Sequence, residues 1–269
     1  MDFLRPASWE EALAAKAEHP TALPIAGGTD VMVEINFDHR RPEYLLDLNR
    51  VGDLYEWEVG EESVRRVASV PYTQIMEHLR AELPGLALAS HTVASPQIRN
   101  RGGVGGNLGT ASPAGDAHPA LLAAGAEVEA ESVRGSRLIP IDDFYTGVKR
   151  NALAPDELIR AVRIRKADGP QQFSKVGTRN AMVIAVCAFA LALSDGRVGT
   201  CIGSAAPTPV RARAAEAVAT GELDWEGRRE LSEALAGRVG GVVGQGASPI
   251  SDAPSPLSVP TQCSGISSR

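Results

Sequence analysis

The sequence predicts an α+β fold organised in two domains. Its 269 residues suit one large domain or two moderate ones, and hydrophobic residues make up 43% of the chain, enough for a globular core. Segments with helical and strand periodicity follow one another in mixed order, and strands are often joined by loops. This order favours α+β over a regular doubly wound sheet. We place a domain boundary near Asp168, where an Asp-Gly-Pro turn interrupts the pattern.

The first domain opens with a helix over residues 8–19, because Ser8 and Glu11 form a capping-box pattern. A short buried strand is expected over 22–26, and residues 30–35 continue as a short helix or a strand. Further strands are expected over 44–48, 63–70, 126–133, 136–141 and 158–164, helices over 72–83 and 118–125, and loops over 142–157.

The second domain is expected to combine strands with helices. Strand-like segments cover 171–177 and 197–206 and flank the apolar run 181–193, and helices are expected over 209–220 and 224–239. Residues 253–269 are rich in proline and serine and lack helical periodicity, so we expect disorder there. A truncation or a reading-frame shift near Asp252 is our hypothesis for this tail.

Composition excludes several functional classes. The net charge is -6 and no basic run stands out, so nucleic acid and anionic membrane are poor partners. No apolar run is long enough to span a bilayer, and the N-terminus does not resemble a secretory signal, so we expect a cytoplasmic protein. Cys187, Cys201 and Cys263 are too few for an all-cysteine iron–sulfur cluster or a cysteine-rich zinc site.

Two glycine-rich stretches are the candidate functional loops, "PIAGGTD" over 24–30 and "GGVGGN" over 102–107. Glycine lets backbone N–H groups approach a ligand oxygen, and successive N–H groups form anion-binding concavities. Two such loops could grip one diphosphate. Neither matches the usual dinucleotide or ATPase fingerprint. The second stretch is too rich in glycine for a good helix interior, and a tight turn is the alternative explanation for each.

Polar side chains accompany both loops. Thr29, Asn107, Thr110 and Ser112 can add hydrogen-bond donors to a phosphate site. Asp116 can only accept hydrogen bonds when ionised, so it suits a ribose or ribityl hydroxyl.

Longer strings are more specific. "AGGTDVM", "TVASPQIRNRGGVGGNLGTASPAGD", "FSKVGTRNAMVIAVCAFALAL" and "IGSAAPTPVRARAAEA" resemble the FAD-binding subunit of molybdenum hydroxylases, a family that includes the medium chains of xanthine dehydrogenase and carbon monoxide dehydrogenase. The resemblance runs from residue 1 to about 250. It implies a two-lobed PCMH-type FAD-binding domain over 1–168, with FAD between the lobes. A smaller C-terminal domain of a short antiparallel sheet and helices is implied over 169–252.

The resemblance also implies the FAD contacts. Residues 25–32 correspond to the family's first phosphate-contacting loop and 103–107 to the second, with Val93 against the flavin and Leu158 and Lys175 as late contacts. Val93 and Leu158 are also explained as core residues, and Lys175 as a surface charge. The expected cofactor-binding residues are Ile25, Ala26, Gly27, Gly28, Thr29, Asp30, Val31, Met32, Val93, Gly103, Val104, Gly105, Gly106, Asn107, Thr110, Ser112, Asp116, Leu158 and Lys175.

Gly103 stands where the family commonly has Thr or Ser. A restored hydroxyl would add a hydrogen bond worth about 0.5–1.5 kcal/mol, so we expect Gly103→Thr to tighten FAD binding. The FAD is expected to be non-covalent, because the first loop offers neither histidine nor cysteine. The lack of cysteine over 117–165 excludes a variant of the benzoyl-CoA reductase type.

The implied function is electron transfer within a hetero-oligomer such as a dimer of heterotrimers. A large molybdopterin subunit would hydroxylate substrate, and a small subunit with two [2Fe-2S] clusters would pass electrons to FAD, which would deliver them to NAD⁺ or another acceptor. We assign no catalytic side chain and no metal ligand: Cys187 is expected in the core and His118 at a helix start. The substrate stays open, with a xanthine dehydrogenase-like enzyme favoured on general frequency.

Two alternatives remain at this point. The chain could be a stand-alone FAD-dependent reductase or oxidase of the same fold group, which would turn over substrate by itself. It could also be a non-catalytic FAD-binding assembly module that its unusual C-terminus has disabled.

Overall fold

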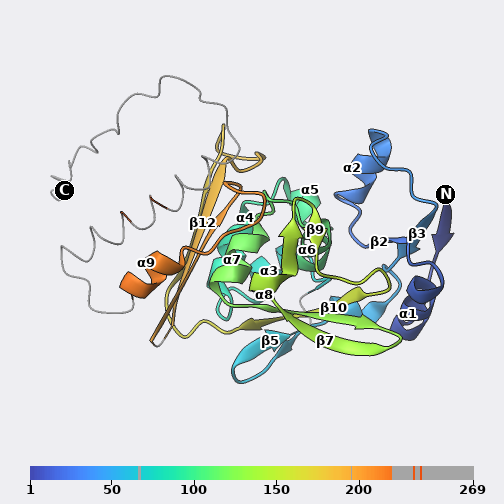
Figure 1. Ribbon diagram of the computed structural model, residues 1–269, viewed down its shortest axis with the longest axis horizontal. Helices are drawn as coiled ribbons and strands as arrows, with labels where there is room; N and C mark the ends of the chain where they lie inside the picture. Colours follow the sequence, from blue (N-terminus) through green and yellow to red (C-terminus); the bar gives the residue numbers. More distant parts are fainter. Residues whose placement is uncertain (66–67, 195, 220–232, 234–236, 238–269) are drawn as a thin grey trace, which may run out of the picture.

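The computed structural model describes residues 1–65, 68–194, 196–219, 233 and 237. The architecture is α+β, as predicted. Figure 1 shows an N-terminal lobe built on a small sheet, a central lobe in which helices cover a larger sheet, and a C-terminal sheet on the far side of those helices. The central helices therefore lie between two sheets.

The N-terminal lobe is a three-stranded parallel sheet in the order β1-β3-β2, with α1 packed on β3. Ser8 is confirmed as the N-cap, because its Oγ accepts from the Glu11 N–H at 3.2 Å. Glu11 Oε2 accepts from the N–H of Ala7, the residue before the cap, at 2.8 Å, so the reciprocal bond is shifted by one residue from a capping box. Residues 31–36 are a helix. The elements are β1 (Asp2–Leu4), α1 (Trp9–Glu18), β2 (Leu23–Ile25), α2 (Val31–Asn36), β3 (Tyr44–Asp47) and the 3₁₀ helix η1 (Gly52–Tyr55).

The central lobe has a five-stranded antiparallel sheet in the order β4-β5-β10-β6-β7. Leu79, Leu108, Leu121, Phe144 and Ile164 are fully buried between this sheet and the helices. The strands are β4 (Glu58–Val59), β5 (Ser63–Arg65), β6 (Glu127–Ser132), β7 (Gly135–Pro140), β8 (Tyr145–Gly147), β9 (Arg150–Asn151) and β10 (Leu158–Arg165). The helices are α3 (Tyr72–His78), α4 (Pro84–His91), α5 (Pro96–Arg99), α6 (Val104–Thr110), α7 (Ala117–Ala123) and α8 (Ile141–Phe144).

Several expected elements have different limits. The helix expected over 72–83 ends at His78, and Pro84 begins α4 where a stop was expected, because proline is well suited to the first turn of a helix. Of the strand expected over 63–70, only β5 forms within the described residues. The expected loop over 142–157 contains part of α8 and the β8–β9 hairpin. The helix expected over 118–125 forms as α7, and Gly125 follows it with a φ of 63°.

The C-terminal sheet is antiparallel, in the order β11-β12-β13, and packs on α4 and α7. The elements of this part of the chain are β11 (Gln171–Val176), β12 (Cys187–Ser194), β13 (Arg197–Gly203) and α9 (Arg213–Val218). The apolar run becomes a strand only from Cys187, which is half-buried and not in the core as expected, and Ile184 before it is 77% exposed. The helix expected over 224–239 and the tail 253–269 lie outside the described residues.

Main-chain atoms form the contact between α7 of the central lobe and β13 of the C-terminal sheet. A Cβ added to Gly199 in β13 would lie 2.0 Å from the Ala123 carbonyl oxygen at the end of α7. Real atoms do not approach that closely, so only glycine allows the helix end to sit on the strand. This packing also fixes where the sheet meets the central lobe.

We predict that Gly199→Ala lowers the free energy of unfolding by about 1–3 kcal/mol, because the added methyl must push two backbone segments apart. Gly52→Ala in η1 is the matched control. A Cβ there meets nothing within 4 Å, and the change should stay within about 0.5 kcal/mol. Chemical denaturation measures both, and equal stabilities for the two variants would contradict this packing.

Candidate functional site

The two glycine-rich loops lie against each other although they are far apart in the sequence. A Cβ added to Gly27, in the turn between β2 and α2, would lie 2.0 Å from the Arg101 carbonyl oxygen. A Cβ added to Gly102 would lie 3.3 Å from Thr29 Oγ1. Gly28 has a φ of 73°, which favours glycine. The fold thus brings together the loops that the sequence singled out, and their closest contact needs glycine.

The second loop is a helix, contrary to the sequence-based expectation. Gly103 is the N-cap of α6, and the Gly105 N–H donates to the Ala68 carbonyl at 2.6 Å. Val104 and Leu108 are fully buried, and Ala111 ends the helix in the left-handed conformation, with a φ of 48°. Tertiary packing of this apolar stripe outweighs the low helix propensity of glycine.

The glycines of the second loop serve two purposes. Added Cβ atoms on Gly103 and Gly105 would lie 2.9 Å from Val70 O and 2.8 Å from Ala68 O, so these residues allow close backbone packing. Gly106 and Gly109 are exposed, and an added Cβ on either meets nothing within 4 Å. One face of α6, at Gly106 and Gly109, therefore exposes main chain that no side chain covers. The expected gain in FAD affinity of Gly103→Thr stays a prediction, and the neighbouring backbone would have to shift to admit its Cβ.

Asp116 and Lys175, both expected cofactor contacts, bind each other. Lys175 Nζ lies 2.8 Å from Asp116 Oδ2 and also donates to the Thr92 carbonyl at 3.1 Å. The Lys175 side chain is only 7% exposed, so it is not a surface charge. Burial raises the pKa of Asp116, and the nearby ammonium opposes that shift. Through this pair, β11 of the C-terminal domain reaches the helices of the candidate site.

Two acceptors beside the glycine loops are left without protein partners. Asp116 Oδ1 and Asn107 Oδ1 are buried, and neither forms a hydrogen bond within the described residues. Buried polar atoms are nearly always paired in native proteins, so such atoms need an explanation. Acceptors of this kind suit a bound molecule with hydroxyl donors.

The remaining expected contacts have hydrogen-bond partners or packing roles within the protein. Thr110 Oγ1 donates to the Gly106 carbonyl at 3.0 Å, and Ser112 Oγ accepts from the Ala114 N–H at 3.4 Å, so both hydroxyls have internal partners. Val93 is half-buried against the central core. Leu158 is buried in the core of the N-terminal lobe beside Trp9, a packing role that accounts for it without any ligand.

Sequence reasoning missed two residues that support the loops. His118 is fully buried, and its Nε2 donates to the Asn107 carbonyl at 3.1 Å. The ring fits because Gly115 has no Cβ, which would lie 2.4 Å from His118 Cε1. The second residue is Tyr72, whose backbone N–H donates to the Gly102 carbonyl at 3.0 Å. No local sequence signal marks either residue, because both roles depend on tertiary contacts.

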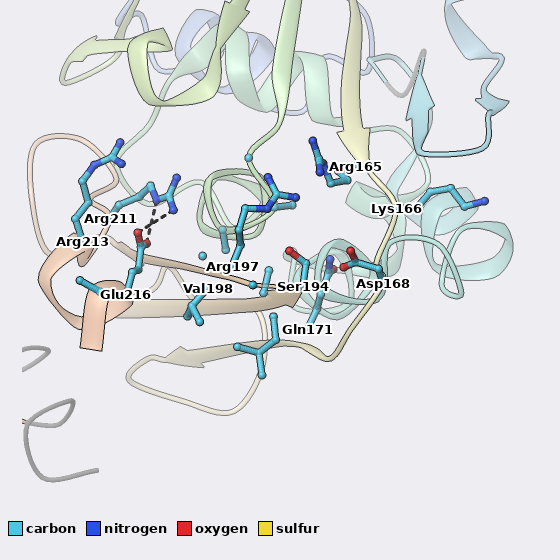
Figure 2. A pocket seen from close by; sticks show the side chains of 18 residues that line it. Arg165, Lys166, Asp168, Gln171, Ser194, Arg197, Val198, Arg211, Arg213 and Glu216 are labelled. Atoms are coloured by element: carbon cyan, nitrogen blue, oxygen red, sulfur yellow. Dashed lines mark hydrogen bonds and ion pairs between the residues drawn. The ribbon is translucent and has the colours of Figure 1, made fainter. Parts of the chain in front are cut away.

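A cavity of about 390 Å³ lies elsewhere, where the end of β10, the β12–β13 turn and α9 meet. Figure 2 shows Arg211 bound to Glu216 on one side and Arg165 on the other, with Arg197 between them. No residue of either glycine loop lines it. Its lining contains more basic side chains than carboxylates. We assign this cavity no function, because α9, which forms one wall, leads directly into residues outside the described part of the chain.

The described residues hold no cluster of three or more His, Cys, Asp or Glu side chains that could bind a metal ion. Among those same residues, no helix combines the length and the apolar character that crossing a membrane requires.

Comparison with known proteins decides the family. Residues 1–166 match the family model described as the FAD binding domain in molybdopterin dehydrogenase. The chain belongs to this family. It is thus an FAD-binding oxidoreductase subunit of the molybdenum hydroxylase type, as the resemblance implied.

Relatives and solved structures agree with this assignment. The FAD-subunit of nicotinate dehydrogenase from Eubacterium barkeri is 35% identical over 74% of this chain and 71% of that protein. The xanthine dehydrogenase FAD-binding subunit of Escherichia coli O157:H7 is 32% identical over 87% of this chain and 84% of that protein. The carbon monoxide dehydrogenase from Hydrogenophaga pseudoflava superimposes with a TM-score of 0.81 and 26% identity, covering 91% of this chain and 93% of that one.

We predict that His118 makes folding of this flavoprotein subunit sensitive to acid. Burial lowers the pKa of His118 to about 4, so its contribution is fully present above the unfolded-state pKa near 6.5 and is lost as pH falls. Between pH 7.5 and pH 5 the difference in unfolding free energy between wild type and His118→Gln should shrink by roughly 2 kcal/mol. Denaturant titrations at both pH values measure it, and a difference that does not change with pH would contradict a buried neutral imidazole.

Proposed function

We propose that this chain carries FAD non-covalently at the contact of its two glycine loops and transfers electrons within a xanthine dehydrogenase-like molybdenum hydroxylase. The observation that carries this proposal is the bare backbone face of α6 beside the unpartnered acceptors of Asn107 and Asp116. Open backbone suits a diphosphate, and the acceptors suit sugar or ribityl hydroxyls, so the residues present fit the dinucleotide.

Each part of the site has a separate role. Backbone N–H groups of the two loops would hold the diphosphate, except those of Met32, Gly105 and Asn107, which already donate to protein carbonyls. The free Asp116 oxygen would accept from a hydroxyl of the cofactor. Lys175 holds Asp116 in place through the ion pair at 2.8 Å and opposes the rise in the Asp116 pKa that burial causes. Val93 would lie against the flavin. Bound FAD supplies a carrier that accepts and releases one or two electrons.

The electron donors would lie in partner chains. With three cysteines, this chain cannot supply the four thiolates that an all-cysteine cluster needs, so [2Fe-2S] centres belong to a small partner subunit and molybdopterin to a large one. The similar relatives include a protein named as a FAD-subunit and another named as a medium subunit. NAD⁺ is the acceptor that we propose first, in a cytoplasmic hetero-oligomer.

The decisive experiment uses the purified chain alone and then with its partner subunits. The chain alone should bind FAD with a flavin absorbance spectrum but should not oxidise purine or aldehyde substrates. With both partners, substrate should reduce the flavin, and NAD⁺ should reoxidise it. Substrate turnover by the chain alone would favour the stand-alone reductase or oxidase. Bound FAD that substrate never reduces in the complex would favour the assembly module.

We predict that Gly106→Ala separates cofactor binding from folding. Its methyl enters the open face, so FAD should bind about tenfold more weakly, while the apoprotein gains up to about 1 kcal/mol from the better helix former. Gly27→Ala should instead destabilise the apoprotein, because its Cβ meets the Arg101 carbonyl. Fluorescence titration and denaturation measure the two effects. Unchanged FAD affinity in Gly106→Ala would show that the open face is not the binding face.

A further inference from the structure

The loop between α4 and α5 is held by cations from two domains. Arg99 Nη1 donates to the carbonyls of His91, Val93 and Ala94 at 3.3, 2.9 and 3.2 Å. Lys175 Nζ donates to the remaining carbonyl, that of Thr92, at 3.1 Å. Four consecutive carbonyl groups therefore accept from one guanidinium and one ammonium.

The loop conformation depends on such support. Ala94 has a φ of 32°, in the region that residues with a Cβ rarely adopt. Other bonds hold the start and the end of the loop. The N–H groups of Thr92 and Val93 donate to the carbonyls of Ala89 and Ser90 at 3.0 and 3.2 Å, and Ser95 Oγ caps α5 through the Ile98 N–H at 3.5 Å. The carbonyls of residues 91–94 all point toward Arg99 or Lys175. A charged donor is about twice as strong as a neutral one in this role.

We propose that Arg99 is a positioning residue of the cofactor site: it fixes the loop 91–94 so that Val93 is presented to the flavin. This inference rests on the proposed function. Arg99 acts through Val93 and its neighbours and not on the cofactor directly. Lys175 completes the arrangement, since its ammonium joins the same loop to Asp116. One chain of polar contacts thus connects α5, the loop 91–94, β11 and the start of α7.

The planar guanidinium is difficult to replace. Nη1 of Arg99 shares its two hydrogens among three carbonyls along the loop, whereas a lysine has enough donors but a shorter stem that would not carry its ammonium to the same position. Without the guanidinium, only one of the four carbonyls, that of Thr92, would still accept from a cation, the ammonium of Lys175. The loop would then relax without unfolding the core, because the Arg99 side chain is only partly buried.

The test compares Arg99→Gln and Arg99→Lys with Arg134→Gln, whose parent side chain is 64% exposed and pairs with Asp156 on the surface. Both Arg99 variants should bind FAD about tenfold more weakly than wild type and alter the visible circular dichroism of the bound flavin. Hydrogen exchange of the amides of residues 92–95 in the apoprotein should be faster. The control variant should match wild type in all three measurements.

Wild-type affinity in Arg99→Gln would overturn the inference. Weaker binding caused only by global destabilisation would also overturn it, and would appear as a lowered melting temperature of the apoprotein with unchanged flavin dichroism and no selective exchange at residues 92–95. If wild type itself fails to bind FAD, the proposed function fails. The exchange measurement on the apoprotein then still decides whether Arg99 orders this loop.

Discussion

The contact between the backbone of Gly27 and that of Arg101 is the constraint on which the candidate site depends. It places the turn after β2 directly on the segment that leads into α6, at a distance that leaves no room for a side chain. The N-terminal and central lobes therefore meet through main chain and present backbone from both sides. Lys149 of the β8–β9 turn adds a second link between the lobes, because its Nζ lies 2.7 Å from Glu34 Oε1 on α2.

The C-terminal sheet contacts the candidate site through one side chain. The ammonium of Lys175, on β11, reaches both Asp116 and the loop that carries Val93. The same sheet packs on α4 and α7, whose ends bear these residues. A disturbance of the sheet would therefore reach Asp116 and the loop between α4 and α5 through one buried cation.

Much of the fold and the location of the site could be predicted from the sequence. The N-cap at Ser8, the strand β3 and the C′ glycine at Gly125 depend on local signals, and the sequence predicts all three correctly. The two glycine loops were identified as neighbours because their composition points to backbone contact. The α6 helix could not be predicted, since it depends on Ala68 and on burial of Val104 and Leu108, which are tertiary facts. For the same reason, the division of the glycines into packed and open ones emerged only from the structure.

Hydrogen exchange of the backbone amides in the presence and absence of FAD tests the central claim most directly. The account predicts that FAD protects amides in both loops, residues 27–30 and 104–107, in the same titration and with the same midpoint. FAD binding that protects only one loop, or that protects neither, would contradict a cofactor held between the two lobes.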